Sequence, residues 1–308
     1  MNKIKTTVTL SKCVDNDIKK GVFNAISKTD FKSKKVNSVL IKPNLCYYWD
    51  YSTGETTDKR VVSAVIDYVR EFCNPDANIR IAEADATAMK TRYVFKMLGY
   101  TDLAAEKNVE LFNLCDDDSK DIEIKTKAGL LKIPLPRSML DSDLIINVPK
   151  LKVPRRIPLT CAMKNLFGCI HNPVKARYHP YLHEVIAGVN CAIKPDLTVV
   201  DGIIALGRYP VKLDLIIAGT DSLAVDYAAA KIIGYNNPYK IKYLQLSKEM
   251  RSDNFAVDII GEDINEIRRQ FPQVNNFLFT LLWDLQLKGI KIYSRVTGDV
   301  VPPILGDL

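Results

Sequence analysis

The sequence has no C-x-x-C pair and no regular cysteine spacing, although it contains seven cysteines. An odd number of irregularly spaced cysteines argues against a disulfide scaffold and favours reduced thiols. No apolar run approaches the roughly 20 residues that a membrane-spanning helix needs, and no signal-peptide core follows Met1. These absences predict a cytoplasmic protein that does not associate with membranes.

Low-complexity tracts, internal repeats and linkers rich in glycine or serine are also missing. What is present is an ordinary globular composition, with 47% hydrophobic and 26% charged residues in a chain of 308. That length is enough to bury a core without help from disulfides or a structural metal. We therefore expect an independently folding protein.

Short β-branched runs alternate with longer amphipathic stretches, a pattern typical of βαβ units. It predicts an α/β fold with a mostly parallel sheet and helices on both faces, because several strands are apolar throughout. The expected helices span residues 57–72 and 221–233, the second ending before Gly234. The expected strands span residues 38–42, 78–82, 109–114, 144–148, 197–200 and 213–218.

Two segments depart from this alternation. Residues 122–134 read as a β-hairpin inserted between α/β units. From about residue 253 the chain predicts a small α+β extension, with a strand, an aromatic- and leucine-rich helix at 275–288 and a strand at 290–294. We therefore divide the chain into a core domain, 1–252, and an extension, 253–308, packed on the core or on a dimer partner.

The net charge of +7 is a local property. No acidic residue lies between Asp143 and Glu184, and the rest of the chain balances acid and base. Such a block of one sign predicts an anion-binding field, and it follows a strand end, where open α/β sheets bind ligands. Few aromatics and no nucleic-acid signature occur there, so a small anion is favoured over nucleic acid. The basic residues of this block are Lys150, Lys152, Arg155, Arg156, Lys164, Lys175 and Arg177.

Four groups of segments resemble the domain of unknown function 362 family, and together they cover roughly residues 36–262. They are IKPNL (41–45) with ETTDKRVV (55–62); DLIINVPKLK (143–152); LTCAMKNLFGCI (159–170) with His179; and IKPDLTVVDGI (193–203) with AGTDSLAVD (218–226).

The resemblance implies a cytoplasmic α/β protein of unsettled biochemistry, often joined to a ferredoxin-like iron–sulfur module. This chain has no C-x2-C-x2-C run. The resemblance therefore points to a redox reaction served by a separate ferredoxin-like or flavin electron carrier. The chain also lacks the glycine-rich loop that members usually carry after residue 203, and it has Val153 and Pro154 where many have a histidine.

The first candidate site residues follow the strand at 38–42. Pro43 forces the chain to turn, which delivers the Asn44 amide, and with it Lys42, to the loop face. Thr56 and Thr57 precede a helix, whose N-terminus can hold a phosphate or carboxylate. The alternatives are a turn-forming asparagine and simple N-cap threonines.

Lys164, Asn165 and Gly168 lie in the most family-specific segment and are the strongest candidates. A lysine in a partly apolar setting can act as an electrostatic clamp or, if desolvated, as a base or Schiff-base amine. Asparagine supplies both a donor and an acceptor. The alternative is a surface lysine on a short helix.

His179 and His183 are four residues apart and, with His171, raise the possibility of a metal site. The HPYLH spacing places no carboxylate between the two histidines to act as base, so we expect no metal and assign none. His179 is instead predicted to bind substrate or to act as general acid or base.

Asp201 follows a strand and is predicted to pair with Lys150 and Lys152 in the cleft, and Asp226 to face the same sheet end or to complement the helix dipole. Four aromatic residues follow the 43–44 turn and either cover a flat substrate or anchor the loop: Tyr47, Tyr48, Trp49 and Tyr51.

The sequence thus predicts an enzyme, with a redox reaction favoured, that binds a small carboxylate or phosphate and forms a homodimer. The predicted catalytic residues are Lys164, His179 and Asp201. A phosphate-handling transferase or ligase and a non-catalytic binding module remain as alternatives, and the pattern identifies no cofactor.

Overall fold

The computed structural model describes residues 3–154 and 157–273, which fold around a nine-stranded sheet. Eight strands follow the order β11-β1-β10-β9-β7-β2-β3-β4, and β8 pairs with β9 beside this path. The strands are β1 (Lys3–Lys12), β2 (Ser38–Pro43), β3 (Asn78–Glu83), β4 (Glu110–Asn113), β7 (Leu144–Val148), β8 (Lys150–Lys152), β9 (Leu197–Leu206), β10 (Pro210–Gly219) and β11 (Asn254–Gly261).

The sheet is mostly parallel, as the sequence predicts. β4, β3, β2, β7 and β9 all run in one direction, and β10 runs against its neighbours β9 and β1. The carboxyl ends of β2, β3 and β7 therefore meet at one edge of the sheet.

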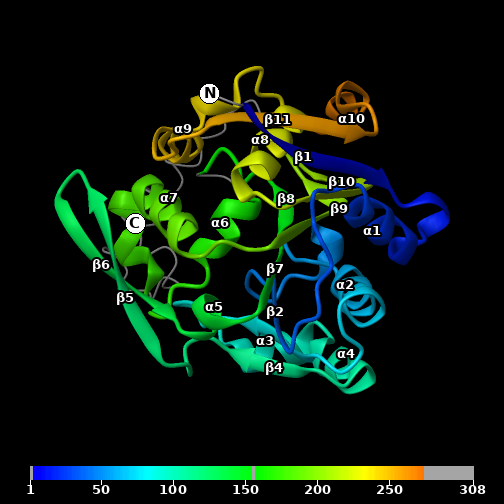
Figure 1. Cartoon of the computed structure of the whole chain (residues 1–308), viewed down its shortest axis with the longest axis horizontal. Helices are drawn as coiled ribbons and strands as arrows, with labels where there is room; N and C mark the ends of the chain where they lie inside the picture. The colour runs from blue at the N-terminus through cyan, green and yellow to red at the C-terminus, as the bar shows by residue number, and fades with distance from the viewer. Residues whose placement is uncertain (1–2, 155–156, 274–308) are drawn as a thin grey trace, which may run out of the picture.

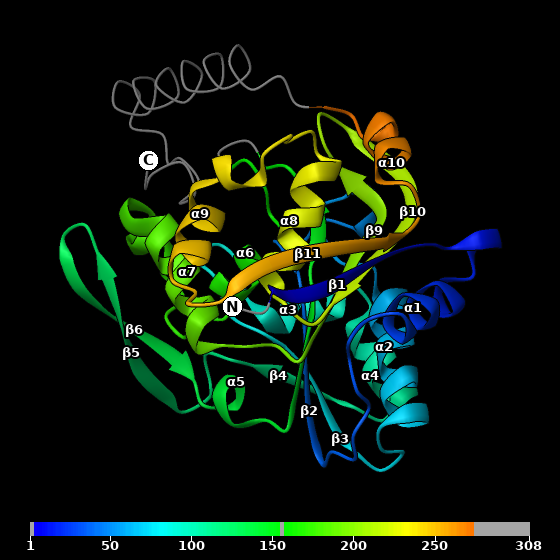
Figure 2. The ribbon, with the colours of Figure 1, turned by 45° about the horizontal axis from the view of Figure 1, so that its top comes forward.

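Helices cover both faces of the sheet, as Figure 2 shows, with α1, α2 and α4 on one side and α6, α7, α8 and α9 on the other. Successive residues of β2 enter different cores, since Leu40 packs with one cluster and Val39 and Ile41 with the other. The helices are α1 (Ile18–Ser27), α2 (Lys59–Phe72), α3 (Thr91–Met97), α4 (Tyr100–Lys107), α5 (Ser138–Asp141), α6 (Ala162–Phe167), α7 (Leu182–Ala192), α8 (Ser222–Ile232), α9 (Lys242–Glu249) and α10 (Ile264–Gln270). Short 3-10 turns span Val14–Asn16, Tyr51–Thr53, Lys175–Tyr181 and Pro238–Lys240.

The two predicted helices form with small changes at their starts. α8 begins after Asp221, whose carboxylate accepts the backbone N–H groups of Leu223 and Ala224. α2 begins two residues later than predicted, because Asp58, rather than Thr56 or Thr57, is its N-cap and accepts from the Arg60 N–H. The interpretation of the two threonines as N-caps is therefore wrong.

The predicted hairpin also forms, as β5 (Ser119–Thr126) and β6 (Gly129–Pro136), a separate two-stranded sheet that projects to one side in Figure 1. Its turn places Gly129 at φ 110°, a conformation that favours glycine. The hairpin packs against α7, where the Ile124 side chain lies directly against Gly188.

The predicted extension begins with a strand that joins the main sheet, since β11 runs parallel to β1 along its whole length. The predicted helix at 275–288 and strand at 290–294 lie outside the described residues, as do Arg155 and Arg156. Within the described part, no helix is long and apolar enough to cross a membrane.

Candidate functional site

A buried ion pair joins the ends of β2 and β3. Lys42 Nζ lies 2.7 Å from Glu83 Oε1, and both side chains are almost fully buried. The other Glu83 oxygen accepts the Leu45 N–H at 3.0 Å, so this carboxylate also fixes the loop that leaves β2. Sequence reasoning found Lys42 but missed Glu83, the last residue of β3. Asp201, predicted to follow its strand, lies inside the longer strand β9 instead.

Asn165 ties helix α6 to the same strand ends. Its amide donates to the carbonyl of Lys42 at 3.2 Å and to Asn147 Oδ1 at 2.8 Å, while its oxygen accepts from Asn44 Nδ2 at 3.0 Å. Gly168, at the end of α6, faces the Lys42 ammonium, because a Cβ there would stand 3.8 Å from Nζ. Four predicted site residues, Lys42, Asn44, Asn165 and Gly168, are thus brought together.

Thr57 connects this group to β7. Its hydroxyl donates to the Val148 carbonyl and accepts the Asn44 N–H, both at 2.9 Å. Thr56 is just as buried, yet its Oγ1 has no hydrogen-bond partner among the described residues, and the same holds for Asn44 Oδ1. Two buried polar atoms near this sheet edge therefore lack a hydrogen-bond partner in the described structure.

Lys150 and Asp201 form a second buried pair. They are register partners on β8 and β9, with Nζ 2.8 Å from Oδ2, and both side chains are fully buried. Asp201 also accepts the Asp58 N–H at 2.7 Å and the Ile203 N–H at 3.0 Å. The predicted pairing of Asp201 with Lys150 is present, and the same carboxylate anchors the start of α2.

Lys152 is directed elsewhere. Its ammonium lies 3.1 Å from Glu55 Oε2 and donates to the Glu55 carbonyl at 2.7 Å. Lys152 is buried, whereas the Glu55 carboxylate is about one-third exposed. The predicted partner Asp201 is therefore not the one Lys152 contacts.

Lys164 has no carboxylate within ion-pair distance among the described residues. Its ammonium lies 4.2 Å from the centre of the Phe167 ring. The pKa of Lys164 is lowered to about 8, chiefly by burial and to a lesser extent by the positive charges of Lys152, Lys175 and Lys42, while Cys46 opposes the shift. The cation is therefore held at a site that already carries excess positive charge.

Within the described structure Lys175 is, like Lys164, a lysine of the basic block without a carboxylate partner, and the site prediction omitted it. It is buried, and its ammonium donates to the backbone carbonyl of Asp85. Burial lowers the pKa of Lys175. The position of Lys175 in the basic block could have identified it as a site residue. The 3-10 turn that buries its side chain, however, has no clear sequence pattern.

The three histidines lie apart. His171 contacts the Asp117 carbonyl at 2.9 Å, and His183 stacks on Tyr243 with a pKa lowered by burial. The exposed His179 stacks on the Phe167 ring, with 6.2 Å between the ring centres, and Lys164 lies over the same ring. Only His179 of the three therefore borders the lysine site, and the described residues contain no group suited to a metal ion.

Asp226 contacts the N-terminal end of α6. Its carboxylate accepts the backbone N–H groups of Ala162 at 2.6 Å and Met163 at 3.1 Å. Burial raises its pKa to about 7, and these hydrogen bonds oppose the rise. Asp226 thus caps α6, the helix that carries Lys164 and Asn165, rather than complementing the dipole of its own helix, α8.

The aromatic loop crosses the rim of the site. Tyr47 adopts φ 55°, and Trp49 is 57% exposed, with no packing that anchors its ring in either core. Tyr48 accepts the Lys90 N–H at 3.3 Å, and Tyr51 lies under the Arg60 guanidinium. The loop is therefore partly anchored, with Trp49 presented to solvent.

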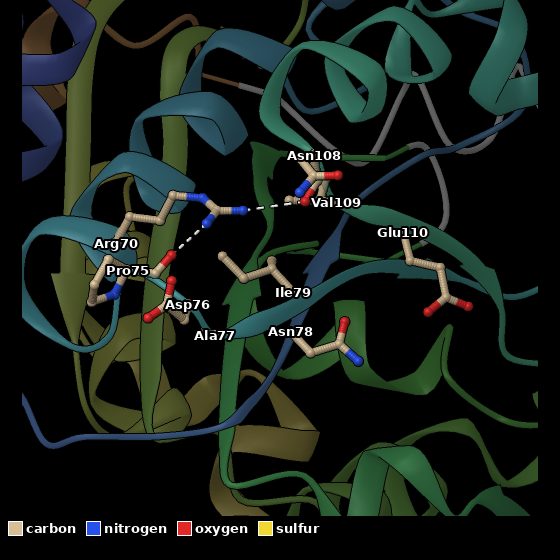
Figure 3. Close-up of a pocket in the computed structure, with 9 residues that line it drawn as sticks. All are labelled: Arg70, Pro75, Asp76, Ala77, Asn78, Ile79, Asn108, Val109 and Glu110. Carbon is tan, nitrogen blue, oxygen red and sulfur yellow. Dashed lines mark hydrogen bonds between the residues drawn. The ribbon is translucent and has the colours of Figure 1, made fainter.

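A surface pocket of about 520 Å³ lies at the opposite edge of the sheet, where β3 and β4 begin (Figure 3). Arg70 crosses it, but its guanidinium already donates to the carbonyls of Pro75, Lys107 and Asn108. This pocket holds none of the predicted site residues, and its Arg70 guanidinium is already engaged, so we place the candidate site at the carboxyl edge.

Comparison with known proteins gives one family and one curated relative. A family model described as a domain of unknown function (DUF362) matches residues 39–231. The thylakoid-associated protein sll1697 of Synechocystis sp. is 28% identical over 220 residues, which are 65% of this chain and 64% of that protein. The chain thus aligns with less than two thirds of the relative's length.

Two solved structures share part of the fold. The lactate racemase apoprotein from Thermoanaerobacterium thermosaccharolyticum has a TM-score of 0.41 and 13% identity, covering 75% of this chain and 57% of that chain. A Thermotoga maritima protein has a TM-score of 0.39 and 13% identity, covering 76% and 59%. Neither similarity is close enough to transfer a ligand or a reaction.

Proposed function

The chain belongs to the domain of unknown function 362 family, and we propose that it binds a small carboxylate or phosphate at the carboxyl edge of its sheet. One observation carries this proposal: the positive charge of Lys175 acts on Lys164, and neither ammonium has a carboxylate within ion-pair distance in the described structure. Removing a cation from water without a counter-charge is costly. An anion bound between these ammonium groups would supply that charge.

The remaining lysines define where the anion binds. Glu83 neutralises Lys42 and Glu55 neutralises Lys152, so these two shape the site while the excess charge stays at Lys164 and Lys175. The Thr56 hydroxyl, buried without a partner, is available to donate to an oxygen of the ligand. We assign anion binding to Lys164 and Lys175, with Lys42, Asn44 and Asn165 holding the strand ends in place.

Two further residues complete the proposed site. His179 and Lys164 contact the same Phe167 ring, which supports His179 as the proton donor or acceptor at the rim. Asp201 is engaged by Lys150 and two backbone N–H groups, which supports a positioning role for its carboxylate.

The proposal is tested by thermal unfolding with phosphate, sulfate, acetate or citrate at constant ionic strength. A ligand that binds only the folded state raises the melting temperature in proportion to the logarithm of its concentration. We expect at least one of these anions to stabilise the wild type and the exposed-lysine control Lys194→Met, but not Lys164→Met. Equal shifts in all three proteins would contradict the proposal.

The reaction class rests on the family resemblance. We propose a redox reaction in the cytoplasm, served by a separate ferredoxin-like or flavin electron carrier, with the protein acting as a homodimer. Flavin or iron–sulfur absorption that co-purifies with the chain, or reduction by an added carrier, supports it. Stabilisation by a nucleotide alone would instead favour a transferase or ligase, and binding without turnover a non-catalytic module.

A further inference from the structure

We infer that Lys164 is a nucleophilic amine that forms an imine with a 2-oxo acid, whose carboxylate is held by the neighbouring lysines. This deepens the proposed anion site and rests on it. The lysines of the site differ in whether they contact a carboxylate. Lys42, Lys150 and Lys152 each contact a carboxylate, whereas Lys164 contacts none in the described structure.

The position of Lys164 suits attack on a bound carbonyl. It lies on α6, one helical turn before Gly168, so both face the same side of the helix. Gly168 in turn faces the Lys42 ammonium, with no side chain between them. Lys164 is partly exposed and Lys175 is buried against the Asp85 carbonyl, so Lys164 is the more accessible of these two amines.

The surroundings of Lys164 also favour the neutral amine. Burial and the three nearby cations disfavour the charged form of Lys164, and they outweigh the cation–π contact with the Phe167 ring, which favours it. With a pKa of about 8 instead of 10.5, its neutral fraction at pH 7.5 is roughly 200-fold higher than that of an ordinary lysine.

The chemical step balances without a further reactant. The neutral Lys164 amine adds its electron pair to the carbonyl carbon, and the oxygen leaves as water after protonation. The product is a protonated imine, formed from one amine, one carbonyl and one proton. His179, beside the same ring, is placed to deliver the proton to the departing oxygen. The positive charge on the imine nitrogen makes the C–H bond next to the imine carbon more acidic.

Reductive trapping tests the inference. The full chain is incubated with pyruvate, 2-oxoglutarate or phenylpyruvate and cyanoborohydride, and the labelled lysine is located by peptide mass spectrometry. We expect one of these acids to label Lys164 at least tenfold more than the exposed Lys194, with labelling that increases from pH 6.5 to 8 and that inorganic phosphate suppresses. Lys164→Arg should lose the adduct, and Lys194→Arg should keep it.

The possible outcomes distinguish the imine at Lys164 from the anion site on which it rests. If none of the three acids labels Lys164 above Lys194 while phosphate still stabilises the protein through Lys164, the imine is wrong and the anion site stands. If neither labelling nor stabilisation occurs, both are wrong. Because labelling, pH dependence and phosphate competition are all measured on the wild type, the test holds even if Lys164→Arg fails to fold.

Discussion

Lys150 and Asp201 face each other across β8 and β9 with 2.8 Å between Nζ and Oδ2, and neither side chain is exposed to solvent. Asp201 also accepts the Asp58 N–H, at the start of α2. The pair therefore links two strands and a helix at the edge where the lysines gather. Each charge is stabilised by the other, because neither side chain is in contact with water.

Breaking this pair should strongly destabilise the protein. Asp201→Asn leaves the Lys150 ammonium buried without its carboxylate, and we expect a loss of about 3–5 kcal/mol in the free energy of unfolding. Glu110→Gln is the matched control, because it removes a partly exposed carboxylate from Arg80 and should cost about 0–1 kcal/mol. Urea denaturation measures both, and similar midpoints for the two variants would contradict the buried role.

Asn165 should be needed to hold α6 against the sheet. Asn165→Ala removes hydrogen bonds to Lys42, Asn147 and Asn44 and leaves their buried polar atoms unpaired, so we expect a loss of about 2–4 kcal/mol. The exposed Asn24→Ala should change stability by less than about 0.5 kcal/mol. A comparable urea midpoint for Asn165→Ala and wild type would show that the network is dispensable.

Asp226 should make stability decrease as the pH rises. Its pKa is raised from 3.8 to about 7, so the folded state holds a proton that the unfolded chain releases, and this stabilisation is lost as the pH rises through 7. Asp226→Asn has no such proton. Between pH 5 and 8 its stability should improve relative to wild type by on the order of 2 kcal/mol. A pH-independent difference would contradict the raised pKa.

Lys164 should make stability increase with pH, in a higher pH range than Asp226. Its pKa is lowered in the folded state, so between about 8 and 10.5 the unfolded chain binds more protons and folding becomes more favourable as the pH rises. Lys164→Met lacks this effect. The melting temperature of the wild type should therefore gain on that of Lys164→Met between pH 8 and 10, with Lys194→Met tracking the wild type. Parallel curves for all three would indicate an ordinary solvated lysine.

The periodic parts of the fold were predictable from the sequence. The apolar runs at β2, β3 and β7 and the amphipathic pattern of α2 depend on local spacing, and all four formed close to the expected residues. β1 was missed, because its alternation of threonine and lysine with apolar residues resembles a solvated N-terminus. Its place beside β10 and β11 depends on pairings with distant segments.

The candidate site was predictable in its location but less so in its pairings. The run without acids located the lysines, and strand ends located Asn44 and Asp201. The sequence could not show that Glu83 and Glu55 neutralise Lys42 and Lys152, since those contacts join segments far apart in the chain. Asp226 was assigned to the anion, but the packing of α8 aims it at the start of α6 instead.

Titration calorimetry of phosphate or citrate into the protein, whichever stabilises it more, tests the anion site most directly. The dissociation constants of wild type, Lys164→Met and Lys194→Met are compared at pH 7 and at constant ionic strength. The account predicts one site per chain, at least tenfold weaker in Lys164→Met, unchanged in Lys194→Met and weaker in the wild type at pH 9 than at pH 7. Equal affinity for all three proteins would contradict it.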